Sequence, residues 1–281
     1  MTVHVLMPVF NRLAMTQAML TCLRAQQVDE SLSIVVIDDG STDGTGEFLK
    51  THADVVVLRG DGSLWWGGAI DVGLRHVLSY AAADDWVLLV NNDTHMKPDF
   101  VQGLLAIARS RAPAAVGSAI RDLQPPHRLL SIGPRIDAWY FRVRDMLDAP
   151  GESSDGIRDV QSADALSGRG VLYPAGALRA VRGMRPRWLP HYMADFELAL
   201  RVRAAGWRLL VSPAVSVQSD DQYGNAYRGA TLWERLFSVR SSSYLPAQIR
   251  FWWEASNFWQ RVTLPLRLTL FVLFPRLRQN K

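Results

Sequence analysis

The chain has 281 residues, a length that suggests one large domain or one domain with an appendage, because domains commonly hold ~150 residues. Its composition, 48% hydrophobic and 21% charged, allows a real core and argues against disorder. Cys22 is the single cysteine, so the sequence excludes an internal disulfide and a zinc site built from cysteines.

The charge is unevenly distributed. The net charge is +4, which by itself would suggest a nucleic-acid partner. Residues 231–281 hold eight basic and two acidic residues, so they carry +6 and leave −2 for residues 1–230. This basic segment also holds four of the ten tryptophans. We therefore expect an acidic domain over residues 1–230 and a distinct amphipathic helical tail over residues 231–281, and no nucleic-acid binding.

The first 120 residues alternate between apolar, β-branched runs and segments with helical spacing. The expected strands are 3–9, 34–37, 55–58, 86–90 and 114–120, and the expected helices are 13–26, 46–51, 69–80 and 100–110. Buried strands joined by helices predict an α/β fold with a mainly parallel sheet that is covered on both faces.

The pattern is irregular over residues 121–165, which contain four prolines and predict loops and irregular strands. Regular elements resume with a strand at 170–173, helices at 175–181 and 195–205, and a strand at 207–212. The first ten residues lack the basic and apolar regions of a signal peptide, so we expect no export. The apolar run 264–274 is too short and too interrupted for a membrane span.

Three expected strands end in polar clusters, at residues 8–11, 38–41 and 91–94. A single cluster of this kind can be turn chemistry alone. In open α/β sheets, however, binding groups collect at the carboxyl ends of the strands, so three clusters together predict a site.

The sequence has neither a GxGxxG motif after the first strand nor a P-loop, so a diphosphate would be bound by other means. Oxygen ligands such as those of Asp93 and Asn91 suit Mg²⁺ or Mn²⁺. An acidic domain that binds an anion therefore predicts a divalent cation.

Four segments together resemble the family 2 glycosyltransferases, which use nucleotide-sugars and have the GT-A fold. They are VHVLMPVFNR (3–12), VIDDGSTDGT (36–45), VLLVNNDTHMKPDF (87–100) and LPHYMADFELALRVRAAGW (189–207). With GDGSLWWGGAIDVGL (60–74), the pattern is most similar to bacterial members that transfer rhamnose or related sugars in surface-polysaccharide assembly. The resemblance covers residues 3–219.

The resemblance implies how the donor is held. Asn91-Asn92-Asp93 occupies the place of the DxD motif, so Asp93 would be the main cation ligand, with Asn91 in place of the first acid. Asp39 would bind the base, with Asp38 as the second choice, although either can be a strand-end cap. Pro8, Phe10 and Asn11 would shape the pocket for base and ribose.

One departure concerns the cation. Many relatives place a histidine ligand where this chain has Gln218, whose carbonyl oxygen is a poorer ligand for Mn²⁺ than imidazole. We therefore expect a weak metal site, or one that the substrate completes, to which Asp220 or Asp221 would contribute.

Asp195 matches the general base of inverting members, which would take the proton from the acceptor hydroxyl. Glu197 follows two residues later, so in a helix the two acids point about 200° apart and only one of them can face a given substrate. His191, Tyr192 and Glu197 would contact acceptor or sugar, and for His191 and Tyr192 the alternative is packing in a loop.

Trp66 and Gly67 precede an expected helix, where glycine N–H groups can face a phosphate, although core packing is an equal alternative for the tryptophan. Arg169 would reach the diphosphate, or lie on the surface.

The tail combines arginines with a high density of aromatic rings. This combination is typical of elements that lie in a membrane interface, and the alternative is packing on the body or on a second subunit. The sequence thus predicts an inverting, metal-dependent hexosyltransferase at the cytoplasmic face of the membrane, moving a sugar from dTDP-rhamnose or a UDP-sugar to a saccharide or lipid-linked acceptor. The alternatives are a polyprenyl-phosphate sugar synthase and a catalytically impaired, nucleotide-sugar-binding member.

Overall fold

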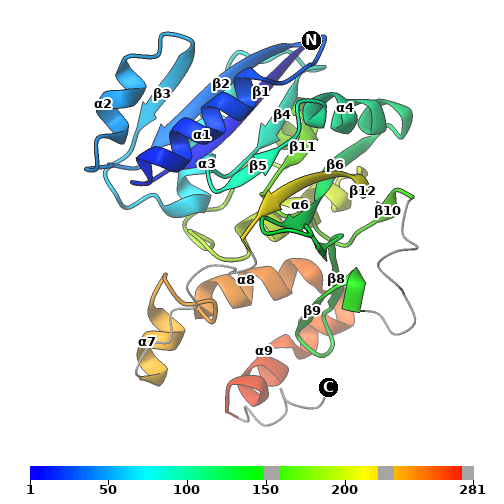
Figure 1. Ribbon diagram of the computed structural model, residues 1–281. Coiled ribbons are helices and arrows are strands. Elements are labelled where there is room, and N and C mark those ends of the chain that lie inside the picture. Colours follow the sequence, from blue (N-terminus) through cyan, green and yellow to red (C-terminus); the bar gives the residue numbers. More distant parts are fainter. Residues whose placement is uncertain (149–158, 221–230, 274–281) are drawn as a thin grey trace.

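The computed structural model of the protein (Figure 1) describes residues 1–148, 159–220 and 231–273. Its main sheet has ten strands over these residues, eight of them in the order β10-β12-β6-β11-β4-β1-β2-β3, with β5 beside β12 and β7 beside β6. The strands are β1 (Thr2–Val9), β2 (Ser31–Asp38), β3 (Val55–Arg59), β4 (Trp86–Leu89), β5 (Thr94–Met96), β6 (Ala114–Asp122), β7 (Leu129–Ser131), β10 (Gln161–Ser162), β11 (Val171–Pro174) and β12 (Arg208–Ser219).

Helices connect most of these strands. They are α1 (Leu13–Arg24), α2 (Thr45–Lys50), α3 (Trp65–Leu78), α4 (Phe100–Ser110), α5 (Ala175–Ala180), α6 (Ala194–Ala204), α7 (Leu232–Phe237), α8 (Leu245–Ala255) and α9 (Phe258–Leu273). The four strands β3, β2, β1 and β4 are parallel neighbours, as are β6 and β12, while β11 runs antiparallel between β4 and β6. The predicted α/β fold with a mainly parallel sheet is confirmed.

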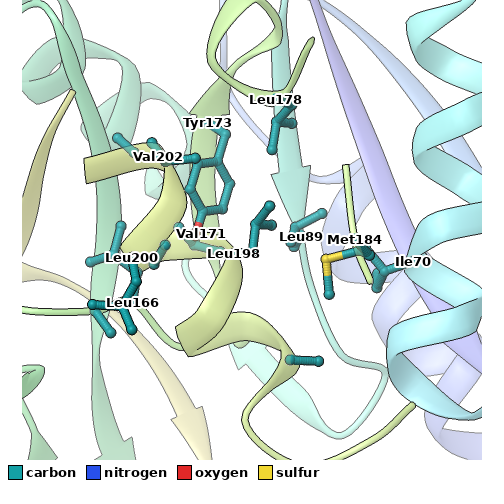
Figure 2. Close-up of a cluster of buried hydrophobic side chains, with 14 of the residues drawn as sticks. Ile70, Leu89, Leu166, Val171, Tyr173, Leu178, Met184, Leu198, Leu200 and Val202 are labelled. Atoms are coloured by element: carbon teal, nitrogen blue, oxygen red, sulfur yellow. The ribbon is translucent and has the colours of Figure 1, made fainter. Parts of the chain in front are cut away.

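Two buried clusters show that the sheet is covered on both faces. One contains Leu20 of α1, Leu49 of α2 and Leu104 of α4. The other contains residues of α3, α5, α6, α8 and α9, and Figure 2 shows part of it around Tyr173 and Leu198. Because both faces are buried, the strands are apolar without alternation, as the sequence pattern indicated.

The irregular segment holds β7 and a separate hairpin made of β8 (Pro134–Asp137) and β9 (Arg142–Asp145), followed by the 3-10 turn Met146–Asp148. Strand β12 is longer than expected because it continues past a register shift between Ser212 and Ser216, which spans Pro213, and then pairs with β5. Sequence patterns did not indicate β5, which has only three residues.

The C-terminal helices pack against the body, below the sheet in Figure 1. Phe251 and Trp252 of α8 are buried in the same cluster as Leu198 of α6, and α9 adds Leu264 to it. Arg267 of α9 also donates hydrogen bonds to the hairpin, at 2.7 Å to the carbonyl oxygen of Ala138. These rings of the tail are core residues, which supports the packing alternative for this part of it.

Among the described residues, no helix combines the length and apolar character needed to cross a membrane. The expected division of the chain at residues 230 and 231 stays a prediction, because residues 221–230, which include Asp221, lie outside the described residues.

Candidate active site

The carboxyl ends of β1, β2 and β4 form one edge of the sheet, because these strands are parallel neighbours. Hydrogen bonds join the polar clusters that follow them. The backbone N–H of Asn11 donates to Ser41 Oγ at 2.7 Å, and the N–H of Thr42 donates to Asn11 Oδ1 at 2.9 Å. Arg12 Nη1 donates to Asp93 Oδ2 at 2.9 Å. The structure thus brings the three clusters together.

Phe10 presents an exposed ring at this edge, next to Gly62. Pro8 lies two residues earlier in the chain, half-buried and in register with Ile37 of β2. A ring beside backbone is a surface on which a nucleobase can stack. The roles of Pro8, Phe10 and Asn11 in base and ribose binding stay predictions that this geometry allows.

The two acids after β2 have different surroundings. Asp38 is 0% exposed, accepts from the N–H of Ser41 at 2.8 Å and forms an ion pair with Arg59 at 2.7 Å. Its side chain therefore supports the loop and is closed to a ligand, which corrects its prediction as a base-binding residue. Asp39 accepts from the N–H of Gly62 at 2.9 Å and from that of Trp65 at 3.0 Å, so it fixes the start of α3.

The first asparagine of the NND motif contacts α3 and the second contacts α1. Asn91 Oδ1 accepts from Trp66 Nε1 at 2.8 Å, and the Trp66 ring packs so closely on Gly168 that a Cβ there would lie 2.2 Å from it. Asn92 is buried and donates to Thr16 Oγ1 of α1 at 3.1 Å. Asn92 is thus structural, contrary to its predicted role in donor binding.

Gly67 also differs from its prediction. Its N–H donates to the carbonyl oxygen of Pro190 at 2.7 Å, so it is not directed at a phosphate. A Cβ at this position would lie 2.4 Å from the carbonyl oxygen of Leu189. The glycine is required because two backbone segments approach each other here.

Asp93 is the strongest cation ligand that the strand ends offer. Its Oδ2 is held by Arg12, while its Oδ1 is buried and has no hydrogen-bond partner. An orphaned buried carboxylate oxygen is costly, and a hard cation would satisfy it. Since Mg²⁺ is commonly held by one or two carboxylates together with substrate phosphates, the residues fit a cation that a bound diphosphate completes.

No group of three or more His, Cys, Asp or Glu side chains suited to a metal exists in the described part of the chain. Gln218 is in register with His95 of β5, two residues after Asp93, so its strand runs beside the NND segment. Its role as a cation ligand stays a prediction.

Asp195 lies in the first turn of α6. Its Oδ2 accepts from the N–H of Gly168 at 2.9 Å and its Oδ1 from the N–H of Phe196 at 2.9 Å. Burial raises the pKa of Asp195 above its ordinary value, an effect that these hydrogen bonds and the charge of Arg169 oppose. A carboxylate with a raised pKa is a stronger base, which suits proton abstraction.

Arg169 is half-buried beside this acid. Its Nη1 donates to Ser219 Oγ at 3.1 Å, near the end of β12, and its charge lowers the pKa of Asp195. The guanidinium thus lies inside the site and not on the open surface.

Glu197 does not belong to the site, which corrects the expectation that it contacts acceptor or sugar. It is 1% exposed and accepts from Arg201 Nε at 2.9 Å and from Arg185 Nη1 at 3.1 Å. Arg250 of α8 lies 3.6 Å away. The acid therefore anchors α8 to α6, on the side of the helix away from Asp195.

His191 and Tyr192 lie in the segment that precedes α6, and the His191 ring lies against Trp65 at the start of α3. The His191 ring centroid lies 5.7 Å from that of Trp65 and 4.5 Å from that of Tyr192. Burial lowers the pKa of His191, and its Nδ1 is buried without a hydrogen-bond partner. A neutral imidazole with an unused nitrogen can bind a sugar hydroxyl. Contact with acceptor or sugar stays a prediction.

Sequence reasoning missed two cations at the site, Arg12 and Arg240. Arg12 is the last residue of the segment VHVLMPVFNR, which ends just after the first strand. Its position there could have indicated that it belongs to the site. Arg240 comes from the tail and lies over the Trp65 ring, 5.9 Å from its centroid. No local pattern could indicate that contact, because 174 residues separate the pair.

Residues 4–135 match the family model described as glycosyl transferase family 2. The chain is also 27% identical over 271 residues to the N-acetylglucosaminyl-diphospho-decaprenol L-rhamnosyltransferase of Mycobacterium tuberculosis H37Rv, an alignment that covers 87% of this chain and 84% of the relative. The chain is thus similar to glycosyl transferase family 2 over residues 4–135 and to a rhamnosyltransferase over most of its length. The resemblance to family 2 and to its rhamnosyltransferase-type members, which the sequence predicted, is confirmed.

Solved structures support the fold of this glycosyltransferase. S. aureus TarS 1–349 in complex with UDP-GlcNAc has a TM-score of 0.60 at 15% identity, over 98% of this chain and 76% of that one. The mannosyltransferase PcManGT from Pyrobaculum calidifontis, in complex with GDP-Man and Mn²⁺, has a TM-score of 0.55 at 16% identity, over 97% and 75%. GalNAc-T7 with UDP, GalNAc and Mn²⁺ has a TM-score of 0.61 at 14% identity. The match covers 78% of this chain and 44% of that one.

Proposed function

We propose that this glycosyltransferase moves a sugar from a nucleotide-sugar, dTDP-rhamnose or a UDP-sugar, to a lipid-linked saccharide in surface-polysaccharide assembly, with inversion at the anomeric carbon. The placement of Asp195 carries the proposal: a single acid with a raised pKa, fixed by two backbone N–H groups beside Arg169. The name of the mycobacterial relative supports the choice of a rhamnosyl donor and of a diphospho-lipid acceptor.

One carboxylate suffices for a single displacement. Asp195 takes the proton of the acceptor hydroxyl while the hydroxyl oxygen attacks the anomeric carbon, and the bond from that carbon to the diphosphate breaks on the opposite face. Glu197 cannot serve as a second acid because three arginines surround it. Inversion is the stereochemical outcome of this arrangement.

The leaving diphosphate needs positive charge. Two arginines of the body are placed to supply this charge, Arg12 at the strand ends and Arg169 beside Asp195. Asp93 would hold a Mg²⁺ or Mn²⁺ ion, with Asn91 and Gln218 as further oxygen ligands, and that ion would neutralise the diphosphate. Two of the structural neighbours were solved with Mn²⁺, which supports a divalent cation.

A lipid-linked acceptor requires the site to work at a membrane surface. The exposed rings of α8, α9 and the hairpin, together with Leu266 of α9, offer such a contact, and we call them the aromatic face: Trp139, Tyr140, Trp253, Phe258, Trp259 and Leu266. Phe258 and Trp259 are each 69% exposed. Arg261 stacks on Trp253 and Arg267 on Trp139, so cations accompany the rings.

Rings at headgroup level with arginines beside them are typical of an interfacial helix, in which the arginines meet anionic lipid. We place the aromatic face on the inner leaflet, where the nucleotide-sugar donor is available. The remainder of the tail holds the body at this surface through the buried Phe251 and Trp252.

A donor screen tests the proposal. Release of nucleoside diphosphate is measured with dTDP-rhamnose and a panel of UDP- and GDP-sugars, with and without Mg²⁺ or Mn²⁺, in the presence of an N-acetylglucosaminyl diphosphate that carries a short prenyl chain. Acceptor-dependent release with one donor is expected. Transfer to polyprenyl phosphate alone would indicate a polyprenyl-phosphate sugar synthase, and binding without turnover an impaired member.

A further inference from the structure

A cavity of about 390 Å³ lies next to Asp195, the proposed general base, between β6, β12, the β8–β9 hairpin and the first turn of α6. The residues that give it its chemical character are Ser118, Ser131, Val143, Arg144, Ser167 and Phe196. This volume is near the lower end of the range for small-molecule sites, so it suits a sugar ring and is too small for a nucleotide-sugar.

The lining residues are bonded to the residues that fix Asp195. Ser167 directly precedes Gly168, whose N–H donates to Asp195 Oδ2, and the N–H of Phe196 donates to Asp195 Oδ1. Ser118 Oγ donates to the carbonyl oxygen of Arg169 at 3.0 Å. The cavity and Asp195 therefore share one wall, formed by the segment around Ser167 and Gly168 and by the first turn of α6.

The lining matches the chemistry of a pyranose. Val143 and Phe196 offer apolar surface to the C–H face of a ring, while the hydroxyls of Ser118 and Ser167 and the Arg144 guanidinium can bind its hydroxyl or amide groups. Ser131 Oγ is engaged within the hairpin region, since it donates to Asp145 Oδ2 and accepts from the N–H of Gly133. Asp145 also lines the cavity, but its Oδ1 accepts from the N–H groups of Ile132 and Leu147, so it is engaged in holding the hairpin. Asp145 is the only acid among the described lining residues, so the cavity offers no free carboxylate to a cation or an amine.

We propose that this cavity is the subsite for the sugar of the acceptor, and that the β8–β9 hairpin sets its specificity. The inference rests on the proposed function, since it presumes a saccharide acceptor. The hairpin joins the cavity to the aromatic face, because Arg144 and Val143 line the cavity while the tip of the same hairpin carries Trp139 and Tyr140. An acceptor whose lipid lies in the membrane would place its sugar under the hairpin.

Two variants test the subsite. Val143→Trp fills the cavity, and Arg144→Ala removes its cation at an exposed position. Arg135→Ala is the matched control, because Arg135 faces Arg144 in the register of the hairpin and does not line the cavity. Thermal unfolding of each variant shows whether it is folded.

Michaelis constants are measured separately for the nucleotide-sugar and for the prenyl-diphosphate-linked N-acetylglucosamine, together with hydrolysis of the donor in the absence of acceptor. Val143→Trp and Arg144→Ala are expected to raise the acceptor KM about tenfold or more, as small changes in a fitted pocket do, while donor KM and donor hydrolysis stay at the wild-type level. Arg135→Ala should match the wild type in all three.

Equal acceptor KM values in wild type and both variants would overturn the subsite while leaving the proposed function intact. Equal losses of donor hydrolysis and transfer would also overturn it, since the cavity would then serve the donor. Absence of transfer by the wild type, with donor hydrolysis retained, would remove the saccharide acceptor and the subsite with it.

Discussion

The backbone N–H of Gly168 donates to Oδ2 of Asp195 at 2.9 Å, and this bond ties the start of α6 to the segment that precedes β11. The carboxylate is thus fixed by the fold before any substrate binds. A general base requires pre-organisation of this kind, because a small displacement of its carboxylate from the acceptor hydroxyl lowers the reaction rate.

Asp195→Asn should lower kcat by about 10²–10⁴-fold, the usual contribution of a general base. The amide can still accept one of the two backbone hydrogen bonds, so α6 should keep its start. Calorimetric titration with the nucleoside diphosphate should give the wild-type affinity, because Asp195 lies apart from the strand ends. Turnover at the wild-type rate would remove Asp195 as the base.

The pH dependence of the reaction follows from the same acid. Burial raises the pKa of Asp195 above 3.8, and only the ionised form can accept a proton. The rate should therefore fall on the acid side at a higher pH than an exposed aspartate would give. A profile of kcat/KM against pH reports this group in the free enzyme. An acid limb at or below 3.8 would contradict the assignment.

Glu197→Gln should lower the free energy of unfolding without a direct effect on the transfer reaction. The side chain is 1% exposed and bonded to Arg201, which is itself buried, so its removal leaves uncompensated charge. Breaking a buried pair of this kind costs about 3–5 kcal/mol. Urea denaturation measures the loss, and Glu47→Gln, at an exposed position of α2, is the control. Equal midpoints for the two variants would place Glu197 outside the stabilising network.

Much of the fold could be predicted because both faces of the sheet are buried and the strands read as apolar runs. The positions of the motif residues also followed from the strand ends. Asn92 and Gly67 could not be assigned correctly, since the direction of an amide side chain and the partner of a backbone N–H depend on segments far along the chain. Glu197 was misassigned for a similar reason: its partners Arg185 and Arg250 come from other elements.

The tail illustrates a second limit. Aromatic composition alone could not separate Phe251 and Trp252, which belong to the core, from Phe258 and Trp259, which face solvent. Helical spacing does not say which side of a helix meets the body until the neighbouring α6 is placed.

Asp93 and Arg12 predict opposite effects on the affinity for Mn²⁺. Asp93→Asn removes the charge of the orphaned carboxylate oxygen that follows β4 and should weaken binding of Mn²⁺ with nucleoside diphosphate by about 10–100-fold. Arg12→Gln removes the cation that holds the other oxygen, so Mn²⁺ in the absence of nucleotide should bind more tightly. Electron paramagnetic resonance of free Mn²⁺ measures both. Unchanged affinity in Asp93→Asn would exclude it as a ligand.

The aromatic face predicts binding to anionic vesicles. Replacing both Phe258 and Trp259 with alanine should lower the vesicle partition coefficient about tenfold or more, because each ring buries apolar area worth about 1.5–3 kcal/mol when fully transferred. Co-sedimentation with phosphatidylglycerol vesicles measures the change. Trp188→Ala removes an exposed ring of the body and should leave binding as in the wild type. Raising the ionic strength should weaken the part that Arg261 contributes, since salt screens its attraction to anionic lipid. Equal partitioning of the double variant and the wild type would leave these rings without a role at the membrane.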